Sequence, residues 1–257
     1  MKRLKHLAIA VAALVTFGGS ALQAQARTLD EIKSDGKVIL ATEGLYPPFN
    51  YMQGSKLTGF EVELAEAVVK KMGLKFEWKS LSFDALLAGL RQDRWDIVIA
   101  SFGITEDRAK AVTFTQPHYC SGGVIVSRDG SVKTVADLNG KVIGVQTGST
   151  YFENAKKVQG IKEVKNYPAD TDARAALTSG RVDAWISDRF VVKSAIDANP
   201  NGIKMGDFLF VERVAAAVKK GNSTLAAAWD KALAETMADG TYKALSEKYM
   251  KEDIRCK

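Results

Sequence analysis

WDIVIASFGITEDRAK, residues 95–110, joins a short apolar segment to a loop of small and hydroxylated residues and then to a charged helix start. A strand as apolar as residues 95–99 is typical of a parallel sheet that is covered on both faces. Open α/β sheets bind their ligands beside the loops that follow the carboxyl ends of such strands. The segment therefore predicts an α/β fold with a candidate ligand site at this loop.

The helix start after this loop provides a candidate anion site. Thr105 is predicted to cap a helix that begins TEDR, and small residues such as Ser101 and Gly103 leave backbone N–H groups accessible. Arg108 beside that helix start could offer a forked cation to a carboxylate or a phosphate. The alternative is an ordinary turn with a solvated surface arginine, and this segment alone does not decide between the two.

Strand and helix patterns alternate along the rest of the chain. Thr28 and Glu31 have the spacing of a capping box, Gly36 is expected to end that short helix, and residues 44–51 are expected to form an irregular loop. Apolar residues recur at helical spacing over 60–72, and Ser82 is expected to cap a helix over 83–90. Strands are predicted at 37–43, 74–81, 95–101, 122–127, 141–146, 163–167, 182–187 and 209–218, and further helices at 134–138, from about 151, 171–180, from about 189, 222–240 and 241–250. Such alternation favours parallel sheets, in two α/β lobes joined by strands that cross between them.

The first 26 residues have the pattern of a secretory signal peptide. A basic segment, MKRLKH, precedes an apolar core and the small-residue cleavage site Ala24-Gln25-Ala26. A membrane anchor is the alternative, but the apolar core is short and wrongly flanked for a transmembrane helix. No cysteine follows the core as a lipidation site. We expect a soluble exported protein of 257 − 26 = 231 residues, starting at Arg27.

The basic balance of the chain largely disappears with this leader. Removing Lys2, Arg3 and Lys5 reduces 36 basic residues to 33, against 30 acidic ones. A net charge near +3 spread along the chain is not the footprint of a nucleic-acid-binding protein. The remaining length suits two lobes of ordinary size.

Cys120 and Cys256 are the only cysteines, and His118 is the only histidine outside the leader. The spacing matches no metal motif, so we expect no metal site, no cofactor and no Cys-His nucleophile. In an oxidising compartment two cysteines indicate a disulfide, although two independent thiols are the alternative.

An ordered set of motifs resembles one family over essentially the whole exported chain. GFEVELAEAVVKKM (59–72) matches the signature of bacterial periplasmic proteins that deliver polar amino acids to ABC importers. Other hallmarks of the family follow in order: ATEGLYPPFNY (41–51), SFDALLAGLRQDRWDIVIAS (82–101), ITEDR (104–108), GKVIGVQTGSTY (140–151), GRVDAWISD (180–188) and ADGTYKALSEKY (238–249).

The resemblance implies a two-lobe periplasmic-binding-protein fold of type II, with a ligand cleft between lobes that two crossing strands join. Lobe 1 would comprise residues 27–121 plus 217–257, and lobe 2 residues 122–216. In the family, the last helix lies in lobe 1 near the crossing strands, so that the resemblance favours a Cys120–Cys256 disulfide.

The resemblance also implies how a zwitterionic ligand would be held. Arg108 would fork the α-carboxylate, joined by backbone N–H groups near Ser149 and Thr150, while Ser101 and Asp188 would receive the α-ammonium. Gly103 departs from the family, since many relatives have Ser or Thr there and this chain lacks that hydroxyl. The other implied ligand-binding residues face the ligand side chain or the loop: Glu43, Tyr46, Phe83, Phe102, Gln146 and Tyr151.

Three of these residues have plain structural alternatives. Phe83 lies on an apolar helix face and could be ordinary core. Glu43 could pair with a distal cation, which favours arginine, lysine, ornithine or histidine as ligand, or could be a structural acceptor. Asp188 could simply cap the following helix.

No catalytic motif is evident, which favours a binding protein with an amino-acid ligand, a membrane permease as partner and a monomeric state. The alternative on the same scaffold is a cyclohexadienyl dehydratase-like enzyme, which needs a cleft carboxyl group as proton donor. A periplasmic sensor domain is a third class, but no transmembrane or cytoplasmic segment follows the last helix. Retention of Arg108 and Asp188 favours binding over dehydration.

Overall fold

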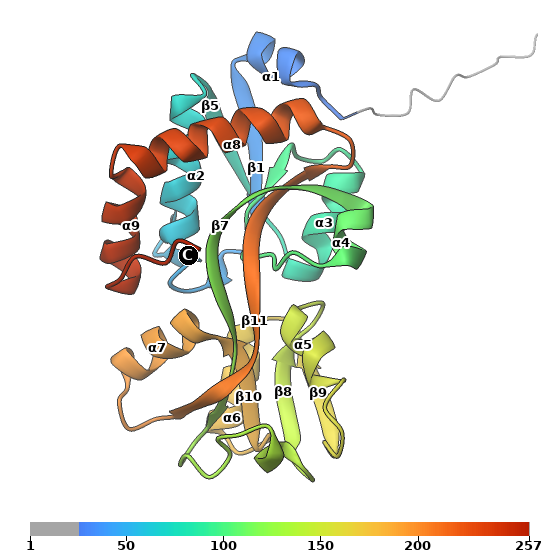
Figure 1. The fold of residues 1–257 in the computed structure, drawn as a ribbon, viewed down its shortest axis with the longest axis vertical. Helices are drawn as coiled ribbons and strands as arrows, with labels where there is room; N and C mark the ends of the chain where they lie inside the picture. The colour runs from blue at the N-terminus through green and yellow to red at the C-terminus, as the bar shows by residue number, and fades with distance from the viewer. Residues whose placement is uncertain (1–25, 257) are drawn as a thin grey trace, which may run out of the picture.

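The computed structural model describes residues 26–256, which form two lobes joined by two long strands (Figure 1). Residues 1–25 of the predicted signal peptide lie outside the described residues. We call the upper body in Figure 1 lobe 1 and the lower body lobe 2. The elements of lobe 1 are α1 (Leu29–Asp35), β1 (Lys37–Thr42), β2 (Leu45–Tyr46), β3 (Asn50–Gln53), β4 (Lys56–Thr58), α2 (Phe60–Lys71), β5 (Lys75–Ser80), α3 (Phe83–Arg91), β6 (Ile97–Val98), α4 (Glu106–Ala111), α8 (Ser223–Ala238) and α9 (Thr241–Met250).

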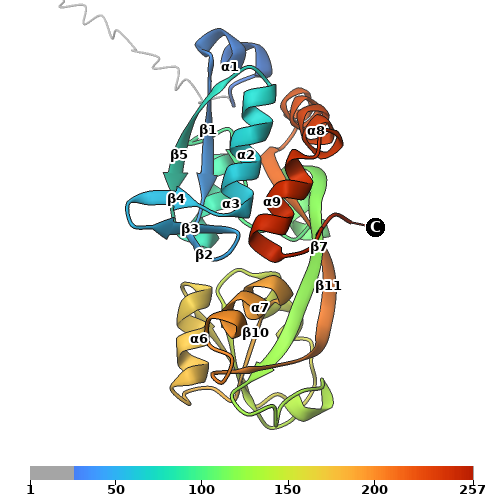
Figure 2. The same ribbon diagram turned by 90° about the vertical axis from the view of Figure 1, so that its left-hand side faces the viewer.

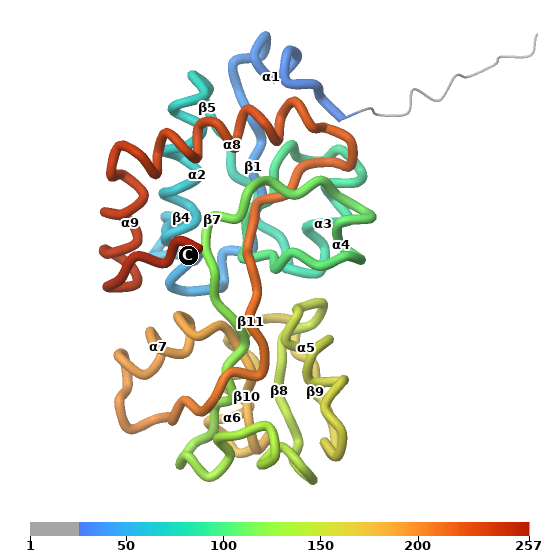
Figure 3. The backbone as a smooth tube through the Cα atoms, in the orientation of Figure 1, coloured from blue at the N-terminus to red at the C-terminus, as the bar shows by residue number. Residues whose placement is uncertain are grey.

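Lobe 2 is built from the middle of the chain. Its elements are the 3-10 turn η1 (Ala136–Leu138), β8 (Val142–Gln146), α5 (Thr150–Ala155), β9 (Glu163–Tyr167), α6 (Asp170–Thr178), β10 (Ala184–Asp188) and α7 (Arg189–Ala198). The connecting strands are β7 (Val112–Ser127) and β11 (Lys204–Lys219), which run side by side between the lobes (Figures 1 and 3).

One mixed sheet of eight strands passes through both lobes in the order β5-β1-β6-β11-β7-β10-β8-β9. The predicted parallel pairing holds inside each lobe, where β1 pairs with β5 and β6, and β8 pairs with β9 and β10. The prediction missed the antiparallel centre: β7 and β11 pair with each other, and with β10 and β6 respectively, in antiparallel register. Because β7 and β11 are the strands that carry the chain out and back, they run in opposite directions.

Local sequence chemistry explains most element ends. Thr28 and Glu31 form the predicted capping box of α1, and Gly36 ends that helix in the left-handed region at φ 66°. At Gly59, the residue before α2, φ is 125° and a Cβ atom would lie 2.2 Å from the carbonyl oxygen of Phe49. Only glycine fits this close approach, so Gly59 sets where α2 starts.

One local prediction is wrong, and a second, the cap of α3 at Ser82, holds in its position only. Residues 44–51 are not an irregular loop, because β2 and the start of β3 pair as a tight hairpin in which Phe49 N donates to Tyr46 O at 2.9 Å. Two prolines at the turn concealed this pairing. Ser82 precedes α3 but its side chain makes no capping hydrogen bond.

The carboxyl-terminal helices α8 and α9 pack back on lobe 1 (Figure 2). Trp229 and Tyr242 of these helices are fully buried. The chain after α9 then lies along β7, since Cys120 N donates to Ile254 O at 3.3 Å. The predicted Cys120–Cys256 disulfide is present, with the two Cα atoms 4.9 Å apart. It joins the end of the chain to one of the two connecting strands.

Candidate functional site

A small cleft between the lobes brings together residues from both halves of the chain. It is almost closed in this structure, with about 10 Å³ of free space, and lies where the carboxyl ends of β1, β6 and β8 approach one another. Its lining residues are Glu43, Tyr46, Phe83, Ala100 and Ser101 from lobe 1 and Gln146, Ser149, Thr150 and Tyr151 from lobe 2. All of these except Ala100 belong to the set implied by the sequence.

Arg108 connects the two lobes at one end of this cleft. Its guanidinium donates from Nη1 to Gly103 O at 2.7 Å and from Nη2 to Gly148 O at 2.9 Å, the latter in lobe 2. The same group lies 5.0 Å from the ring centre of Phe102 and 5.8 Å from that of Phe83. Arg108 is therefore not a solvated surface arginine: aromatic rings and backbone carbonyls hold a forked cation in place.

The loop that carries this arginine is held as predicted at its helix start. Thr105 Oγ1 accepts from Arg108 N at 3.2 Å and caps α4. Burial lowers the pKa of Arg108 from its usual value, against the nearby carboxylate of Glu212, which raises it. An arginine remains charged under these conditions, so a fixed positive charge lies at this end of the cleft.

A buried network under Ser101 fixes the orientation of its hydroxyl. Ser101 has φ 55°, and its N and Oγ both donate to the Glu61 carboxylate, at 2.8 and 3.0 Å. Glu61 is fully buried and also contacts His118 Nε2 at 2.9 Å and Asn50 Nδ2 at 2.9 Å. Because the Ser101 hydroxyl donates its proton to Glu61, its lone pairs are free to accept from a ligand N–H group.

Asp188 is fully buried at the junction of β10 and α7. One carboxylate oxygen, Oδ1, accepts from Phe190 N at 2.7 Å, so this oxygen caps α7 as the structural alternative expects. The other oxygen, Oδ2, has no hydrogen-bond partner among residues 26–256, although Ser121 lies near. Burial raises the pKa of Asp188 to about 7. A buried acceptor with a free oxygen suits an ammonium group.

Glu43 and Gln146 meet across the cleft. Gln146 Nε2 donates to Glu43 Oε1 at 2.7 Å, which means that Glu43 does act as a structural acceptor here. Burial, together with the nearby carboxylate of Asp170, raises the pKa of Glu43 to about 8. Asp170 is itself buried, accepts from Trp185 Nε1 at 3.0 Å, and has its pKa raised by burial to about 7. Acidic groups thus surround this end of the cleft.

Two tyrosines close the wall between these ends. Tyr46 OH lies 3.0 Å from Tyr151 OH and 3.4 Å from Ser187 Oγ, both in lobe 2. Phe83 stacks on Phe102 with ring centres 4.3 Å apart. Phe83 is both core and cleft wall, since it is buried and also lines the cavity.

The structure also places residues in the site that the sequence analysis did not single out. One group holds Ser101 in place: its hydrogen-bond partner Glu61 is contacted in turn by His118 and Asn50. The other residue is Glu212 on β11, which lies beside Arg108 and Thr150. Glu61 lies inside the GFEVELAEAVVKKM motif, where its acidic side chain interrupts a buried helix face. Glu212 lies on β11, which also carries Asp207 and Arg213, so no comparable signal in the sequence marked it.

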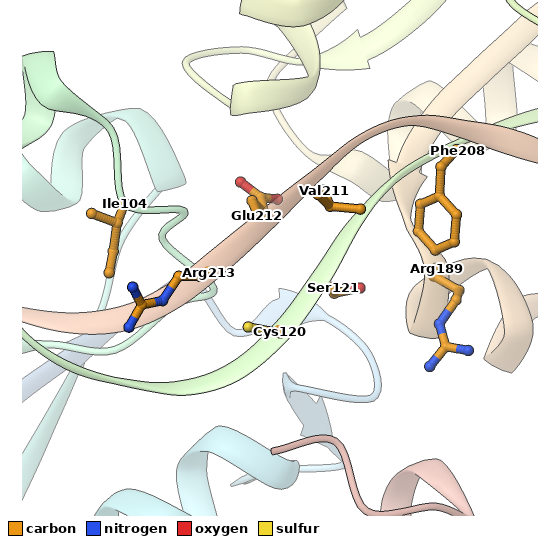
Figure 4. A pocket seen from close by; sticks show the side chains of 8 residues that line it. All are labelled: Ile104, Cys120, Ser121, Arg189, Phe208, Val211, Glu212 and Arg213. Carbon is orange, nitrogen blue, oxygen red and sulfur yellow. The ribbon is translucent and has the colours of Figure 1, made fainter. Parts of the chain in front are cut away.

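A wider depression lies on the connecting strands (Figure 4). It measures about 660 Å³ and shares Glu212 and Ser121 with the groups described above. It is lined by Ile104, Cys120, Ser121, Arg189, Phe208, Val211, Glu212 and Arg213. Its surface is mostly apolar, although Arg189, Glu212 and Arg213 also line it, and Val211 is 77% exposed. The polar groups that converge from both lobes distinguish the smaller cleft as the candidate site.

Within residues 26–256, no cluster of three or more His, Cys, Asp and Glu side chains could hold a metal ion. No helix in the same part of the chain is both long and apolar enough to span a bilayer.

Comparison with known proteins gives a consistent result. Residues 38–252 match the sequence model of the bacterial extracellular solute-binding proteins, family 3. The chain is 35% identical over 232 residues to the L-cystine-binding protein TcyJ of Escherichia coli strain K12, covering 88% of this chain and 87% of that one. Two similar solved structures are an ancestral arginine-binding protein bound to arginine (40% identity, TM-score 0.79, 83% and 98% of the two chains) and AncCDT-1, an ancestral amino acid-binding protein and precursor of cyclohexadienyl dehydratase (28% identity, TM-score 0.81, 86% and 98%).

Proposed function

The chain belongs to the bacterial extracellular solute-binding proteins of family 3, and we propose that it captures an amino acid, polar or cationic, in the cleft between its lobes and delivers it to the membrane permease of an ABC importer. The observation that carries this proposal is the separation of charge in one cleft. Arg108, with donors left over after its two carbonyl contacts, lies at one end, and Asp188, whose Oδ2 is buried without a partner among residues 26–256, lies near the cleft residues Tyr46 and Tyr151.

These two groups suit the two charges that every free amino acid carries. A planar guanidinium pairs with a carboxylate through parallel N–H bonds, which a lysine could not provide. Asp188 Oδ2 and the lone pairs of Ser101 would accept from the α-ammonium. In this arrangement neither ligand charge is left unpaired when water is excluded.

The acidic surroundings of Glu43 support a ligand with a distal N–H or cationic group. Burial raises the pKa values of Glu43 and Asp170, and the charge of Asp170 raises that of Glu43 further, so a cationic ligand near Glu43 would stabilise its ionised form. Tyr46 and Phe83 would flank an aliphatic stem. Arginine, lysine, ornithine and histidine meet these requirements, and cystine, the ligand in the name of TcyJ, offers a second ammonium group.

A thermal-shift screen would test the proposal. The panel contains the twenty amino acids, ornithine, cystine and octopine-like conjugates, with D-arginine as the control for stereospecific contacts. A ligand at a hundred times its dissociation constant should add about 2.7 kcal/mol to the free energy of unfolding. A panel in which no amino acid stabilises the protein would contradict the proposal.

We also propose that the ligand closes the cleft by rotation about β7 and β11. Half of the polar groups belong to each lobe, so a ligand that contacts both halves binds the closed form more tightly than an open one. Small-angle scattering should report a smaller radius of gyration at saturating ligand than without it. An unchanged radius would indicate a rigid cleft.

A cyclohexadienyl dehydratase-like activity is the second candidate, because AncCDT-1 shares this fold and the cleft holds carboxyl groups with pKa values of about 7 to 8. Such a group could protonate a leaving hydroxyl. The Arg108 and Asp188 pair favours a zwitterion instead. Incubation with prephenate, followed by chromatography, distinguishes the two: turnover would favour the enzyme, and its absence with amino-acid binding would favour the carrier.

The remaining parts of the proposal concern the molecule as a whole. We propose export to the periplasm by a signal peptide at residues 1–26, action as a monomer, and lobes formed by residues 27–121 with 217–257 and by residues 122–216. These boundaries fall within or next to β7 and β11.

A further inference from the structure

Glu212 is the acidic group that the amino-acid clamp described above does not use. It lies on the connecting strand β11, and Figure 4 shows its carboxylate leaving the strand in a different direction from the guanidinium of Arg213. Along a strand, successive side chains point to opposite faces, and although Glu212 and Arg213 both border the wider depression, the Glu212 carboxylate lies beside Thr150, Tyr151 and Arg108. Its Oε2 atom is buried and has no hydrogen-bond partner among residues 26–256.

The close approach of Glu212 to Gly103 fixes where this carboxylate lies. A Cβ atom on Gly103 would be 1.9 Å from Glu212 Oε2 and 3.1 Å from Thr150 Cγ2. Gly103 does not have a positive φ, so its backbone would accept another residue. The Glu212 carboxylate therefore occupies the space that a serine or threonine side chain would fill at position 103.

The groups around this carboxylate are those of the anion end of the cleft. Arg108 donates to Gly103 O, and Thr150 and Tyr151 face Glu212 from lobe 2. Burial raises the pKa of Glu212, while Thr150, Arg108 and Tyr151 lower it, in that order. A ligand carboxylate bound to Arg108 would lie beside a second carboxylate, and like charges at such range repel.

We propose that Glu212 is a specificity-determining residue of this cleft. Its negative charge repels a ligand carboxylate bound at Arg108 and so lowers the affinity for ligands that are negatively charged at that end. The inference rests on the proposed function, since it needs a ligand whose α-carboxyl carbon lies at Arg108. Gly103 makes this arrangement possible, because any Cβ atom at position 103 would meet the Glu212 carboxylate. The pair selects for ligands that carry enough positive charge elsewhere to offset this repulsion.

Matched ligands isolate the effect. L-arginine and L-argininamide share the cationic end and the α-ammonium and differ only in the charge of the carboxyl group; L-cystine and its diamide form a second pair. The measured quantity is the affinity for the acid divided by the affinity for its amide, by calorimetric titration of wild type and Glu212→Gln. The substitution keeps the shape of the side chain and removes its charge.

We expect the acid-to-amide ratio to rise about tenfold in Glu212→Gln, the effect of removing a carboxylate repulsion in a partly solvated cleft. Glu163→Gln on β9, exposed and outside the cleft, is the matched control and should leave the ratio unchanged. If another amino acid of the panel binds best, that acid and its amide form the matched pair; a wild-type protein that binds no amino acid of the panel would contradict the proposed function, and the inference with it. A wild type that binds, with a ratio that Glu212→Gln leaves unchanged or lowers, would overturn the inference alone.

Gly103→Ser gives a second, independent test. A serine Cβ at this position would displace the Glu212 carboxylate, so the ratio should rise in the single variant, and the double variant with Glu212→Gln should gain little more. Fully additive effects would show that Gly103 and Glu212 act independently, and would overturn the proposed role of the close approach.

Discussion

Replacing Arg108 with alanine removes the group on which the carboxylate end of the cleft depends. In the structure the guanidinium uses two of its donors on Gly103 O and Gly148 O and lies over the rings of Phe83 and Phe102. The substitution therefore removes the counter-ion of a ligand carboxylate and also a hydrogen bond between the lobes.

The size of the loss follows from the burial of the charge that is left unpaired. Truncating one partner of a buried, hydrogen-bonded charge pair costs about 2–5 kcal/mol of binding free energy. This range corresponds to a dissociation constant roughly 30-fold to several thousand-fold weaker. Arg108→Lys should fall between wild type and alanine, because an ammonium keeps the charge but cannot make parallel bonds to a carboxylate.

Calorimetric titration with the best ligand from the screen measures the effect. Arg181→Ala is a matched control, because Arg181 is exposed and lies outside the cleft, with a hydrogen bond from its side chain to Ser179. Circular dichroism establishes that each variant is folded. A folded Arg108→Ala protein that binds within about threefold of wild type would refute the assignment of the carboxylate end.

Three further predictions concern the other end of the cleft and the disulfide. Asp188→Asn should weaken binding of amino acids by about tenfold or more but spare analogues that lack the α-ammonium; equal losses for both, by calorimetry, would remove its assigned role. Since burial raises the pKa of Glu43 to about 8 and that of Asp188 to about 7, a cationic ligand should expel protons at pH 7 and bind more tightly as the pH rises from about 6 to 8. Titration in buffers of different ionisation enthalpy measures that release, and proton uptake would contradict the charge assignment. The disulfide closes a loop with a sequence separation of 136, so replacing Cys120 and Cys256 by serine should lower the free energy of unfolding by up to ~5 kcal/mol in chemical denaturation; an unchanged midpoint would exclude a stabilising bond.

Local chemistry made much of the fold predictable. The capping box of Thr28 and Glu31 starts α1, and the left-handed backbone of Gly36 ends it. Thr105 caps the start of α4 in the same way. The loop after β6 and its arginine were recognisable for a similar reason, because small residues and a forked cation after a buried strand are a local pattern. These features depend on neighbours in the sequence.

Contacts between distant segments were not predictable in this way. Nothing near Glu61 in the sequence indicates that its carboxylate would meet His118 and Ser101, and His118, the lone histidine of residues 26–256, gave no sign of its partner. The departure at Gly103 was visible, but its consequence was not, because Glu212 reaches it from a strand far along the chain. The prediction for residues 44–51 was wrong for a different reason, because two prolines suggested a loop where a tight hairpin forms.

A crystal structure of the protein with the best amino acid from the screen tests the central claim most directly. We predict one ligand between the lobes, with its α-carboxylate paired to the guanidinium of Arg108 and its α-ammonium bonded to Asp188 Oδ2 and Ser101 Oγ. A ligand bound outside this cleft, or bound within it with the carboxylate away from Arg108, would contradict the account.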